Sequence, residues 1–229
     1  MNLRWFLAAG LLWITVTHAV EPLDKNLIDI STKPGMALFQ RSVNLTTLKL
    51  MSHFTTQKTS TYCGVASAVM ILNASGLPAP LDSLHPSYHY FTQEDFFNAD
   101  VQQIITPQEV EHHGIPLSTL QQVIQHFGLK TDLFYANELS VDAFRSLIKD
   151  TIFHQKFMIV NFLRTGLMQQ GGGHHSPISA YDEETDRVLL LDVARYKYPA
   201  YWVQVADLWK AMNTKDQGVY RGVLVVQPI

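Results

Sequence analysis

The sequence predicts an α+β fold in which a helical half is followed by an antiparallel sheet half. Helix-capping signals recur along residues 62–154, whereas later residues form short apolar and β-branched runs separated by turn residues. The composition, with 47% hydrophobic and 16% charged residues in a chain of 229, is that of a globular protein with a sizeable core. We therefore expect residues 20–229 to form one domain.

Capping residues set the boundaries of the expected helices. The helices are expected over residues 62–74, 95–99, 106–114, 118–128 and 141–154. In the third of them, Thr106, Pro107 and Glu109 have identities that favour the N-cap, N1 and N3 positions. The preceding polar residues 21–34 indicate an irregular arm or linker.

The second half of the chain has the signals of strands and hairpins. Strands are expected over residues 157–163, 177–181, 187–193 and 219–226, with a short helix over residues 205–212. The turn-rich residues 182–186 join the second and third of these strands, which predicts an antiparallel hairpin.

The first 19 residues have the pattern of a secretory signal peptide. Arg4 supplies a positive charge, residues 5–16 are apolar, and Ala19 suits signal peptidase. The apolar run is shorter than the roughly 20 residues of a membrane-spanning helix, so cleavage is favoured over an uncleaved anchor. The formal net charge of −3 gives no reason to expect a nucleic-acid or membrane-surface partner.

Cys63 is the only cysteine of the chain. In an exported protein a lone thiol is either functional or buried and inert. Cys63 lies at the start of an expected helix, where the helix dipole favours the thiolate, and Gly64 permits close approach to the backbone. Gln57, six residues upstream, can donate to an oxyanion beside the backbone N–H of Cys63, with a surface amide as the alternative.

A glycine-rich loop leads into a pair of histidines. Residues 171–173 are glycines, and His174 and His175 follow at the mouth of a strand. An imidazole can deprotonate a thiol and later protonate a leaving amine, although a surface histidine is the alternative for either residue. Because adjacent side chains of a strand point to opposite faces, we expect only one of the two to face Cys63.

The predicted hairpin connects Asp192 to these histidines. Pairing about a turn centred near Glu184 places Asp192 beside Ser176 and close to His174. A carboxylate there can orient an imidazole and select its tautomer. The chain order of Cys63, His174 and Asp192, on a helix followed by two strands, indicates a papain-like cysteine protease fold, with Asp in place of the more usual Asn.

These motifs resemble the phytochelatin synthase family in its short bacterial form. The matching stretches are residues 57–73, 172–177, 191–199 and 207–212. The six-residue step from Gln57 to Cys63 and the eighteen-residue step from His174 to Asp192 also match, and the resemblance covers residues 35–228. The family pattern Gly-His-x-Ser-Pro selects His174 over His175 as the catalytic histidine.

The resemblance implies transfer of the γ-glutamylcysteinyl dipeptide of glutathione. The Cys63 thiolate attacks the Cys–Gly amide, glycine leaves with a proton from His174, and a thioester remains. Water then yields γ-glutamylcysteine, whereas a second glutathione yields phytochelatin. Because Cys63 is the only thiol, we expect hydrolysis to dominate. No tightly bound cofactor is expected, and heavy-metal ions such as Cd²⁺ or Zn²⁺ would enter as glutathione thiolate complexes.

The resemblance also implies substrate-binding residues. Arg221 suits the α-carboxylate of the γ-glutamyl group and Asp216 suits its ammonium. Further positions match residues near the family's active site: Arg164, Arg195, Tyr198 and Tyr62. For Arg195 and Tyr198, bracing of the hairpin is an equal alternative.

Two other functions stay open on the sequence alone. One is a general papain-like cysteine peptidase, and the other is a periplasmic metal-binding protein suggested by ten histidines. The second is weakened because Pro86 interrupts the spacing of His85 and His89, and adjacent histidines splay apart on a helix. We expect glutathione as the partner, a bacterial periplasmic location, no membrane contact after signal cleavage, and a homodimer by similarity.

Overall fold

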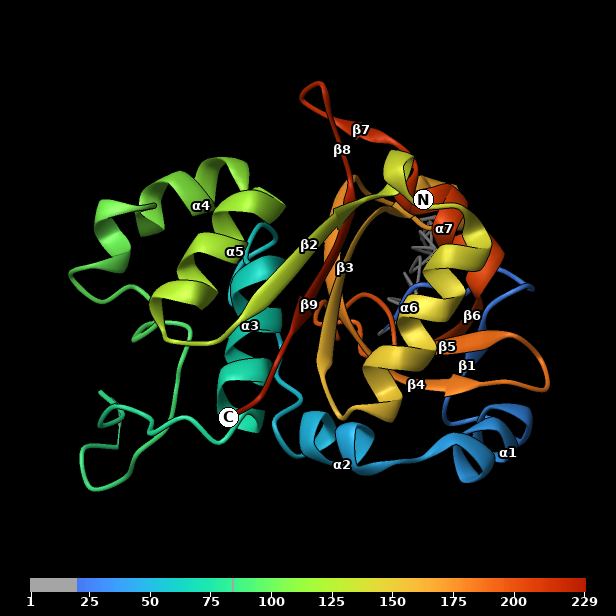
Figure 1. Cartoon of the computed structure of the whole chain (residues 1–229), viewed down its shortest axis with the longest axis horizontal. Helices are drawn as coiled ribbons and strands as arrows, with labels where there is room; N and C mark the ends of the chain where they lie inside the picture. Colours follow the sequence, from blue (N-terminus) through green and yellow to red (C-terminus); the bar gives the residue numbers. More distant parts are fainter. Residues whose placement is uncertain (1–19, 84) are drawn as a thin grey trace, which may run out of the picture.

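The computed structural model describes residues 20–83 and 85–229, so the predicted signal peptide lies outside the described residues. The described chain has the predicted α+β architecture, with a helical half beside an antiparallel sheet (Figure 1). Within the described residues, none of the helices combines the length and the apolar character that crossing a membrane requires.

Seven strands form the main sheet in the order β1-β6-β5-β4-β3-β9-β2, and all of its pairings are antiparallel. Their bounds are Ile28–Asp29 (β1), Thr131–Tyr135 (β2), Phe157–Leu163 (β3), Gly173–Asp182 (β4), Arg187–Leu190 (β5), Tyr201–Gln204 (β6) and Gly222–Val226 (β9). A small separate hairpin joins Lys215–Asp216 (β7) to Val219–Tyr220 (β8).

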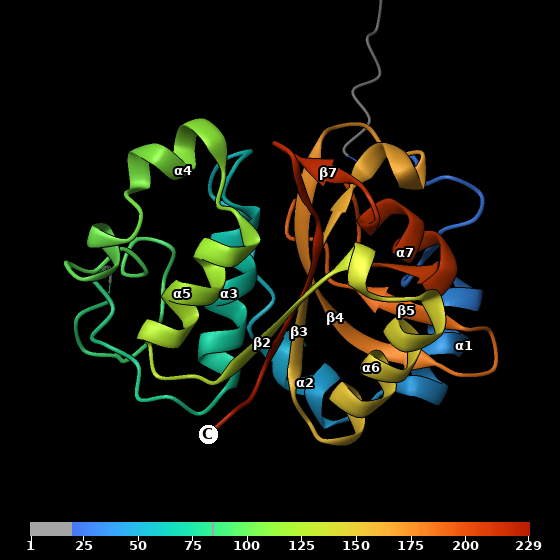
Figure 2. The ribbon, with the colours of Figure 1, turned by 45° about the horizontal axis from the view of Figure 1, so that its top comes forward.

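Helices cover both faces of the sheet (Figure 2). The α-helices are Lys33–Ser42 (α1), Leu45–Ser52 (α2), Cys63–Ala74 (α3), Pro107–His113 (α4), Leu117–His126 (α5), Val141–Phe153 (α6) and Val205–Met212 (α7). Among the described residues, 3-10 turns cover Val101–Gln103, Ala136–Glu138 and Arg164–Leu167. One core lies between the sheet and α1, α2, α3 and α5, and a second lies between the sheet and α6 and α7.

Helix α3 lies between α5 and strand β4 and is buried almost throughout. Its residues from Val65 to Leu72 are all buried, as expected of a helix that is apolar on every face. This burial holds the first turn of α3, and with it Cys63, against the start of β4.

The hairpin of β4 and β5 is confirmed, with one irregularity that matters for the site. The register shifts between Ile178 and Ala180, so that Ile178 lies opposite Leu190. Strand β5 ends at Leu190, earlier than the sequence predicts, but the Leu191 N–H still donates to the Pro177 carbonyl at 3.0 Å. The pairing direction therefore carries Asp192 to the beginning of β4.

Two local expectations were wrong. Residues 95–99 form turns in place of a helix, although the Thr92 hydroxyl accepts from the Asp95 N–H as a cap would. Phe96 packs on Phe127 and Phe97 packs on Tyr62, so tertiary contacts override the capping signal here.

The expected arm over residues 21–34 is also ordered in part. Ile28 pairs with Trp202 in the sheet, and Thr32 caps helix α1. The pairing of Ile28 with Trp202 joins segments that are far apart in the chain, which is why local patterns did not reveal β1.

Candidate active site

Cys63 is the first residue of α3 and is 8% exposed. Tyr62, at the N-cap, makes no side-chain capping bond to the helix, so the positive end of the helix dipole is directed at the Cys63 region. The next residue is Gly64, and no larger side chain fits there, because a Cβ at this position would lie 2.4 Å from Ile115 and 3.6 Å from His175 Nδ1. The thiol therefore sits in a tight, enclosed site.

His174 and Asp192 form a buried pair, as the hairpin predicts. His174 Nε2 lies 2.9 Å from Asp192 Oδ1, which leaves Nδ1 as the ring nitrogen available to Cys63. Burial lowers the pKa of His174, but the charge and hydrogen bond of Asp192 and a hydrogen bond with Cys63 outweigh it, so the net pKa is raised. The imidazolium form is thus favoured beside the sulfur.

Asp192 is held as a carboxylate by several donors. It is fully buried, and Arg164 donates to both of its oxygens at 2.9 Å. The Ala194 N–H donates to Oδ1 as well, also at 2.9 Å. Burial raises the pKa of Asp192, but the charges and hydrogen bonds of His174 and Arg164 lower it by more, so the net pKa is far below its usual range.

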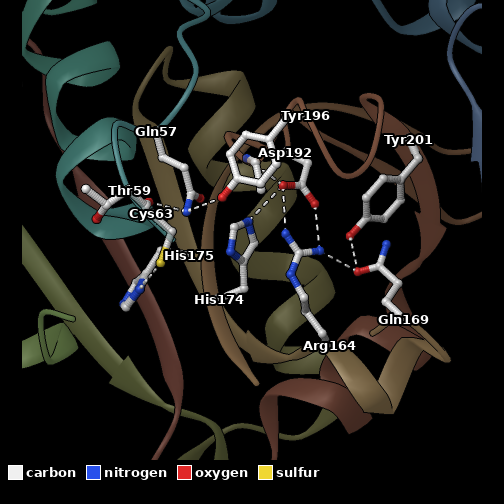
Figure 3. A network of polar contacts seen from close by, with 11 residues as sticks. Gln57, Thr59, Cys63, Arg164, Gln169, His174, His175, Asp192, Tyr196 and Tyr201 are labelled. Carbon is white, nitrogen blue, oxygen red and sulfur yellow. Dashed lines mark hydrogen bonds and ion pairs between the residues drawn. The ribbon is translucent and has the colours of Figure 1, made fainter. Parts of the chain in front are cut away.

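Both histidines reach Cys63, which corrects the expectation that only one of them can. The Cys63 Sγ atom lies between the two rings, 3.6 Å from His175 Nδ1 (Figure 3). Burial raises the pKa of the thiol, but hydrogen bonds and charge interactions with His174 and His175 lower it well below its ordinary value. The reason is that the sulfur lies at the start of β4, where side chains from both faces of the strand are accessible.

Gln57 lies beside this centre (Figure 3). Its backbone N–H donates to the Val193 carbonyl at 2.8 Å, which ties the segment before α3 to the segment that carries Asp192. Its side-chain amide donates to the Thr59 carbonyl at 2.6 Å and to the Tyr196 hydroxyl at 3.2 Å. The amide group is therefore in place near Cys63, with its hydrogens engaged by neighbouring oxygens.

Arg221 and Asp216 meet at the wall of a cavity. Arg221 is 5% exposed, and its Nη2 lies 3.2 Å from Asp216 Oδ2. Within the described chain, Arg221 Nε and Nη1 have no hydrogen-bond partner. The cavity has a volume of about 210 Å³ and is lined by His113, Ile115, Pro116, Leu117, Ser118, Tyr135, Asn161, Asp216, Gln217, Val219, Tyr220 and Arg221.

The cavity adjoins the catalytic strand. A Cβ added to Gly173 would lie 2.7 Å from Arg221 Nη2, so the guanidinium lies directly beside the residue that precedes His174. Asn161, another wall residue, contacts His175. The thiol site and the cavity are thus neighbours, connected through Asn161 of β3 and through Arg221, which lies against Gly173 of β4.

The other four predicted substrate-binding residues make contacts inside the protein. Arg164 is engaged by Asp192 and lies over the Tyr198 ring at 5.0 Å, and the Tyr198 hydroxyl accepts from the Gln170 N–H at 2.8 Å. Tyr62 is buried against the edge of Phe97. Arg195 lies over the Phe54 ring at 4.7 Å. Their placement favours bracing of the site over direct substrate contact, because these side chains already have protein partners.

Sequence reasoning missed Tyr196 and Asn161 as residues of the site, and it set aside His175, which contacts the sulfur. Tyr196, which is 52% exposed, contacts Gln57, and His175 contacts both Cys63 and Asn161. The one available signal was Asn161, a polar residue in the middle of the buried apolar strand β3. A buried amide in such a strand needs a partner, and here the partner is an imidazole.

Comparisons with known proteins find a family and several relatives of this chain. The phytochelatin synthase family model matches residues 19–222. The chain is 33% identical over 210 residues to glutathione gamma-glutamylcysteinyltransferase 3 of Lotus japonicus, covering 88% of this chain and 42% of that protein. It is 33% identical over 207 residues to glutathione gamma-glutamylcysteinyltransferase 1 of Arabidopsis thaliana, covering 87% and 41%.

A fungal relative and one solved structure are also similar. The glutathione gamma-glutamylcysteinyltransferase of Schizosaccharomyces pombe is 28% identical over 214 residues, covering 90% of this chain and 50% of that protein. The chain thus spans half or less of the length of these relatives. A C39-like peptidase from Bacillus anthracis superposes with a TM-score of 0.48 at 13% identity, covering 81% of this chain and 98% of that one. The family model and the curated relatives together show that this chain belongs to the phytochelatin synthase family.

Proposed function

We propose that this chain is a glutathione γ-glutamylcysteinyl dipeptidyl transferase and hydrolase in which Cys63 is the nucleophile. The observation that carries the proposal is the sulfur at the start of α3, held beside an imidazole that is itself held by a buried carboxylate. The names of the sequence relatives supply the substrate, and the chain's own residues supply the chemistry.

Acylation uses the protonated His174 and the Cys63 thiolate. The sulfur attacks the carbonyl carbon of the Cys–Gly amide, and the resulting oxyanion accepts from the Cys63 backbone N–H and from the Gln57 amide, which exchanges its bond to the Tyr196 hydroxyl for one to the oxyanion. His174 then gives its proton to the nitrogen of the departing glycine, and a γ-glutamylcysteinyl thioester remains on Cys63. Asp192 keeps the ring oriented throughout, because its oxygen accepts from Nε2.

Deacylation reverses the proton transfers. His174, now neutral, accepts a proton from water or from the α-amino group of a second glutathione as that group attacks the thioester. Water releases γ-glutamylcysteine, and the amine of glutathione extends the chain. In both cases Cys63 leaves as a thiolate, which its low pKa makes a good leaving group.

The cavity beside Gly173 suits the γ-glutamyl end of glutathione. That end carries an α-carboxylate and an α-ammonium group. The two unpartnered nitrogens of buried Arg221 can receive the carboxylate, and Asp216 can receive the ammonium. A volume of about 210 Å³ also favours a small amino-acid moiety over a protein segment.

Three related proposals rest on the sequence. Heavy-metal ions such as Cd²⁺ or Zn²⁺ act as part of the substrate, because glutathione thiolates are soft ligands that bind them well. The signal-like residues 1–19 direct export to the periplasm of a bacterium. Similarity to relatives suggests that two copies form a homodimer.

Mass spectrometry after brief exposure to glutathione tests the proposal. We expect the Cys63 peptide to gain the γ-glutamylcysteinyl mass, and free glycine to appear in solution. An adduct that lacks glycine is distinct from a mixed disulfide, which retains the whole tripeptide. Cys63→Ser is the control and should show no thioester. Cleavage of an unrelated peptide with no glycine release from glutathione would support a general cysteine peptidase instead.

A further inference from the structure

Both hydrogens of the Gln57 side-chain amide have acceptors within the protein. Its Nε2 lies 2.6 Å from the Thr59 carbonyl oxygen and 3.2 Å from the Tyr196 hydroxyl, which points at it (Figure 3). A carbonyl oxygen can only accept, so the nitrogen of the amide, and not its oxygen, must face Thr59. One amide hydrogen is therefore bonded to Thr59 and the other to Tyr196, so an oxyanion has to replace one of these two acceptors.

The bond to Tyr196 is the one that an oxyanion can replace at lower cost. It is longer than the bond to the Thr59 carbonyl, and the Tyr196 side chain is half-exposed. The backbone nearby is held in place, because the Ala194 N–H donates to buried Asp192 at 2.9 Å. Release of the Gln57 amide therefore needs only a rotation of the exposed tyrosine side chain.

Gln57 does not depend on Tyr196 for its position. Its backbone N–H donates to the Val193 carbonyl at 2.8 Å, and the bond to Thr59 orients its amide. Gln57 itself is buried, so an amide hydrogen without an acceptor there would be costly. The Tyr196 hydroxyl thus supplies an acceptor for this hydrogen in the resting enzyme, rather than a brace for the residue.

The Tyr196 hydroxyl is a neutral acceptor, whereas an oxyanion is a charged one. Burial raises the pKa of this hydroxyl above its ordinary value, and the negative charges of Asp192 and Cys63 add to the effect. The Arg164 charge and the bond from Gln57 lower the pKa by less. A hydrogen bond to a charged acceptor is about twice as strong as one between neutral groups. The amide therefore gains by exchanging the hydroxyl for an oxyanion, but gains little by exchanging it for a neutral carbonyl.

We propose that Tyr196 is a positioning residue of the oxyanion site, whose hydroxyl holds the Gln57 amide hydrogen in the resting enzyme and releases it to the oxyanion of the tetrahedral intermediate. The proposal rests on the roles of Cys63 and Gln57 in the proposed function. Loss of the hydroxyl should make the resting enzyme less stable and acylation faster, because the oxyanion then satisfies an amide hydrogen that had no acceptor. A tyrosine that braces Gln57 would instead make acylation slower when it is lost.

The test compares two reactions of the Cys63 thiolate. With p-nitrophenyl acetate the sulfur attacks a carbonyl carbon, an oxyanion forms, and p-nitrophenolate leaves an acetyl thioester. With iodoacetamide the sulfur displaces iodide from carbon, and no oxyanion forms. For Tyr196→Phe, which keeps the ring and so keeps the amide buried, we expect the burst of p-nitrophenolate to be about 2- to 10-fold faster, the size of one neutral hydrogen bond. Alkylation by iodoacetamide should be unchanged.

The matched background is Gln57→Ala. This variant should slow the burst, and Tyr196→Phe added to it should have no further effect, because the hydroxyl then has no amide to hold. Cys63→Ser measures the reaction of the ester with other groups. Tyr88→Phe removes the hydroxyl of an exposed tyrosine and should leave both reactions unchanged. A burst that is slower or unchanged in Tyr196→Phe, or equally accelerated in the Gln57→Ala background, would overturn the proposal.

Urea unfolding of the unreacted protein is a second measurement. Tyr196→Phe should lower the denaturation midpoint in the otherwise unchanged protein and should leave it unaltered in the Gln57→Ala background. A midpoint that does not fall, or that falls equally in both backgrounds, contradicts the proposal. Neither reagent is glutathione, so a missing glycine release would count against the proposed function, while the burst and alkylation rates would still decide the role of Tyr196.

Discussion

Arg164 and Arg221 are buried to nearly the same extent, yet their surroundings differ. The guanidinium of Arg164 donates to both oxygens of Asp192 and to Gln169 Oε1. The guanidinium of Arg221 contacts the half-exposed Asp216, and its remaining nitrogens face a cavity without partners among the described residues.

This difference distinguishes residues that hold the site together from residues that are available to bind a ligand. A buried charge with all its partners in the protein is part of the scaffold, since breaking the pair leaves an uncompensated charge. A buried charge with unpartnered donors at a cavity wall is prepared for a ligand. The same residue type thus holds the catalytic acid–base pair in one region and offers a binding group in the other.

The largest effect is expected at the acid–base pair itself. His174→Ala removes the imidazole that Asp192 orients, so the turnover of glutathione should fall by about 10²–10⁴-fold. His175→Ala at neutral pH should have a smaller effect, because the proton-transfer group remains. Glycine release under saturating glutathione measures both. Equal losses in the two variants would contradict the division of roles between the histidines.

A substitution of Asp192 tests whether Arg164 is part of the scaffold. Asp192→Asn leaves Arg164 buried without a counter-charge, and we expect the free energy of unfolding to fall by about 3–5 kcal/mol. Urea denaturation followed by circular dichroism measures it. The exposed pair of Lys210 and Asp207 provides the control, and Lys210→Gln should change stability by less than about 0.5 kcal/mol. A small effect of Asp192→Asn would show that Arg164 is not part of the scaffold.

A substitution of Arg221 tests whether this residue binds the substrate. Arg221→Leu removes the proposed carboxylate partner, so KM for glutathione should rise about 10- to 100-fold, the equivalent of one charge-assisted hydrogen bond or bidentate pair. Stability should be kept or increased, because Nε and Nη1 have no partners among the described residues and Nη2 contacts only the half-exposed Asp216. Steady-state kinetics and thermal unfolding of the same preparation separate the two effects. A strong loss of stability with unchanged KM would assign Arg221 to the scaffold instead.

A third ion pair, between Arg41 and Asp182 at the far end of β4, provides a more exposed case for comparison with the first two. Arg41 donates to both oxygens of Asp182. Burial raises the pKa of Asp182, but the hydrogen bonds from Arg41 and Thr185 outweigh this effect and lower the pKa to about 2. Because the folded pKa is below the unfolded one, this pair stabilises the protein above about pH 4, and the contribution is lost as the pH falls through about 2.

The corresponding variant is Asp182→Asn. It should lower stability at neutral pH by about 1–2 kcal/mol, less than Asp192→Asn, because Arg41 is partly exposed and screened by solvent. It should also flatten the decline of stability between about pH 4 and pH 2. Denaturation midpoints across this pH range measure the slope, and an unchanged slope would show that other carboxylates dominate it.

Local sequence signals determined the parts of the site that depend on neighbouring residues. The helix start at Cys63 follows from local patterning, and the hairpin that brings Asp192 to His174 follows from a turn between two β-branched runs. Such features can be predicted because turn and cap geometry act over a few residues, so that chain order alone limits where the side chains can go.

Only the tertiary structure decided the rest. The placement of both histidines on one sulfur, the fork of Arg164 onto Asp192, and the cavity beside Arg221 all depend on how α3 and the loops pack against the ends of β3 and β4. The helix at residues 95–99 was lost for the same reason. Contacts between segments far apart in the chain are set by the shape of the shared core, which no short stretch of sequence encodes.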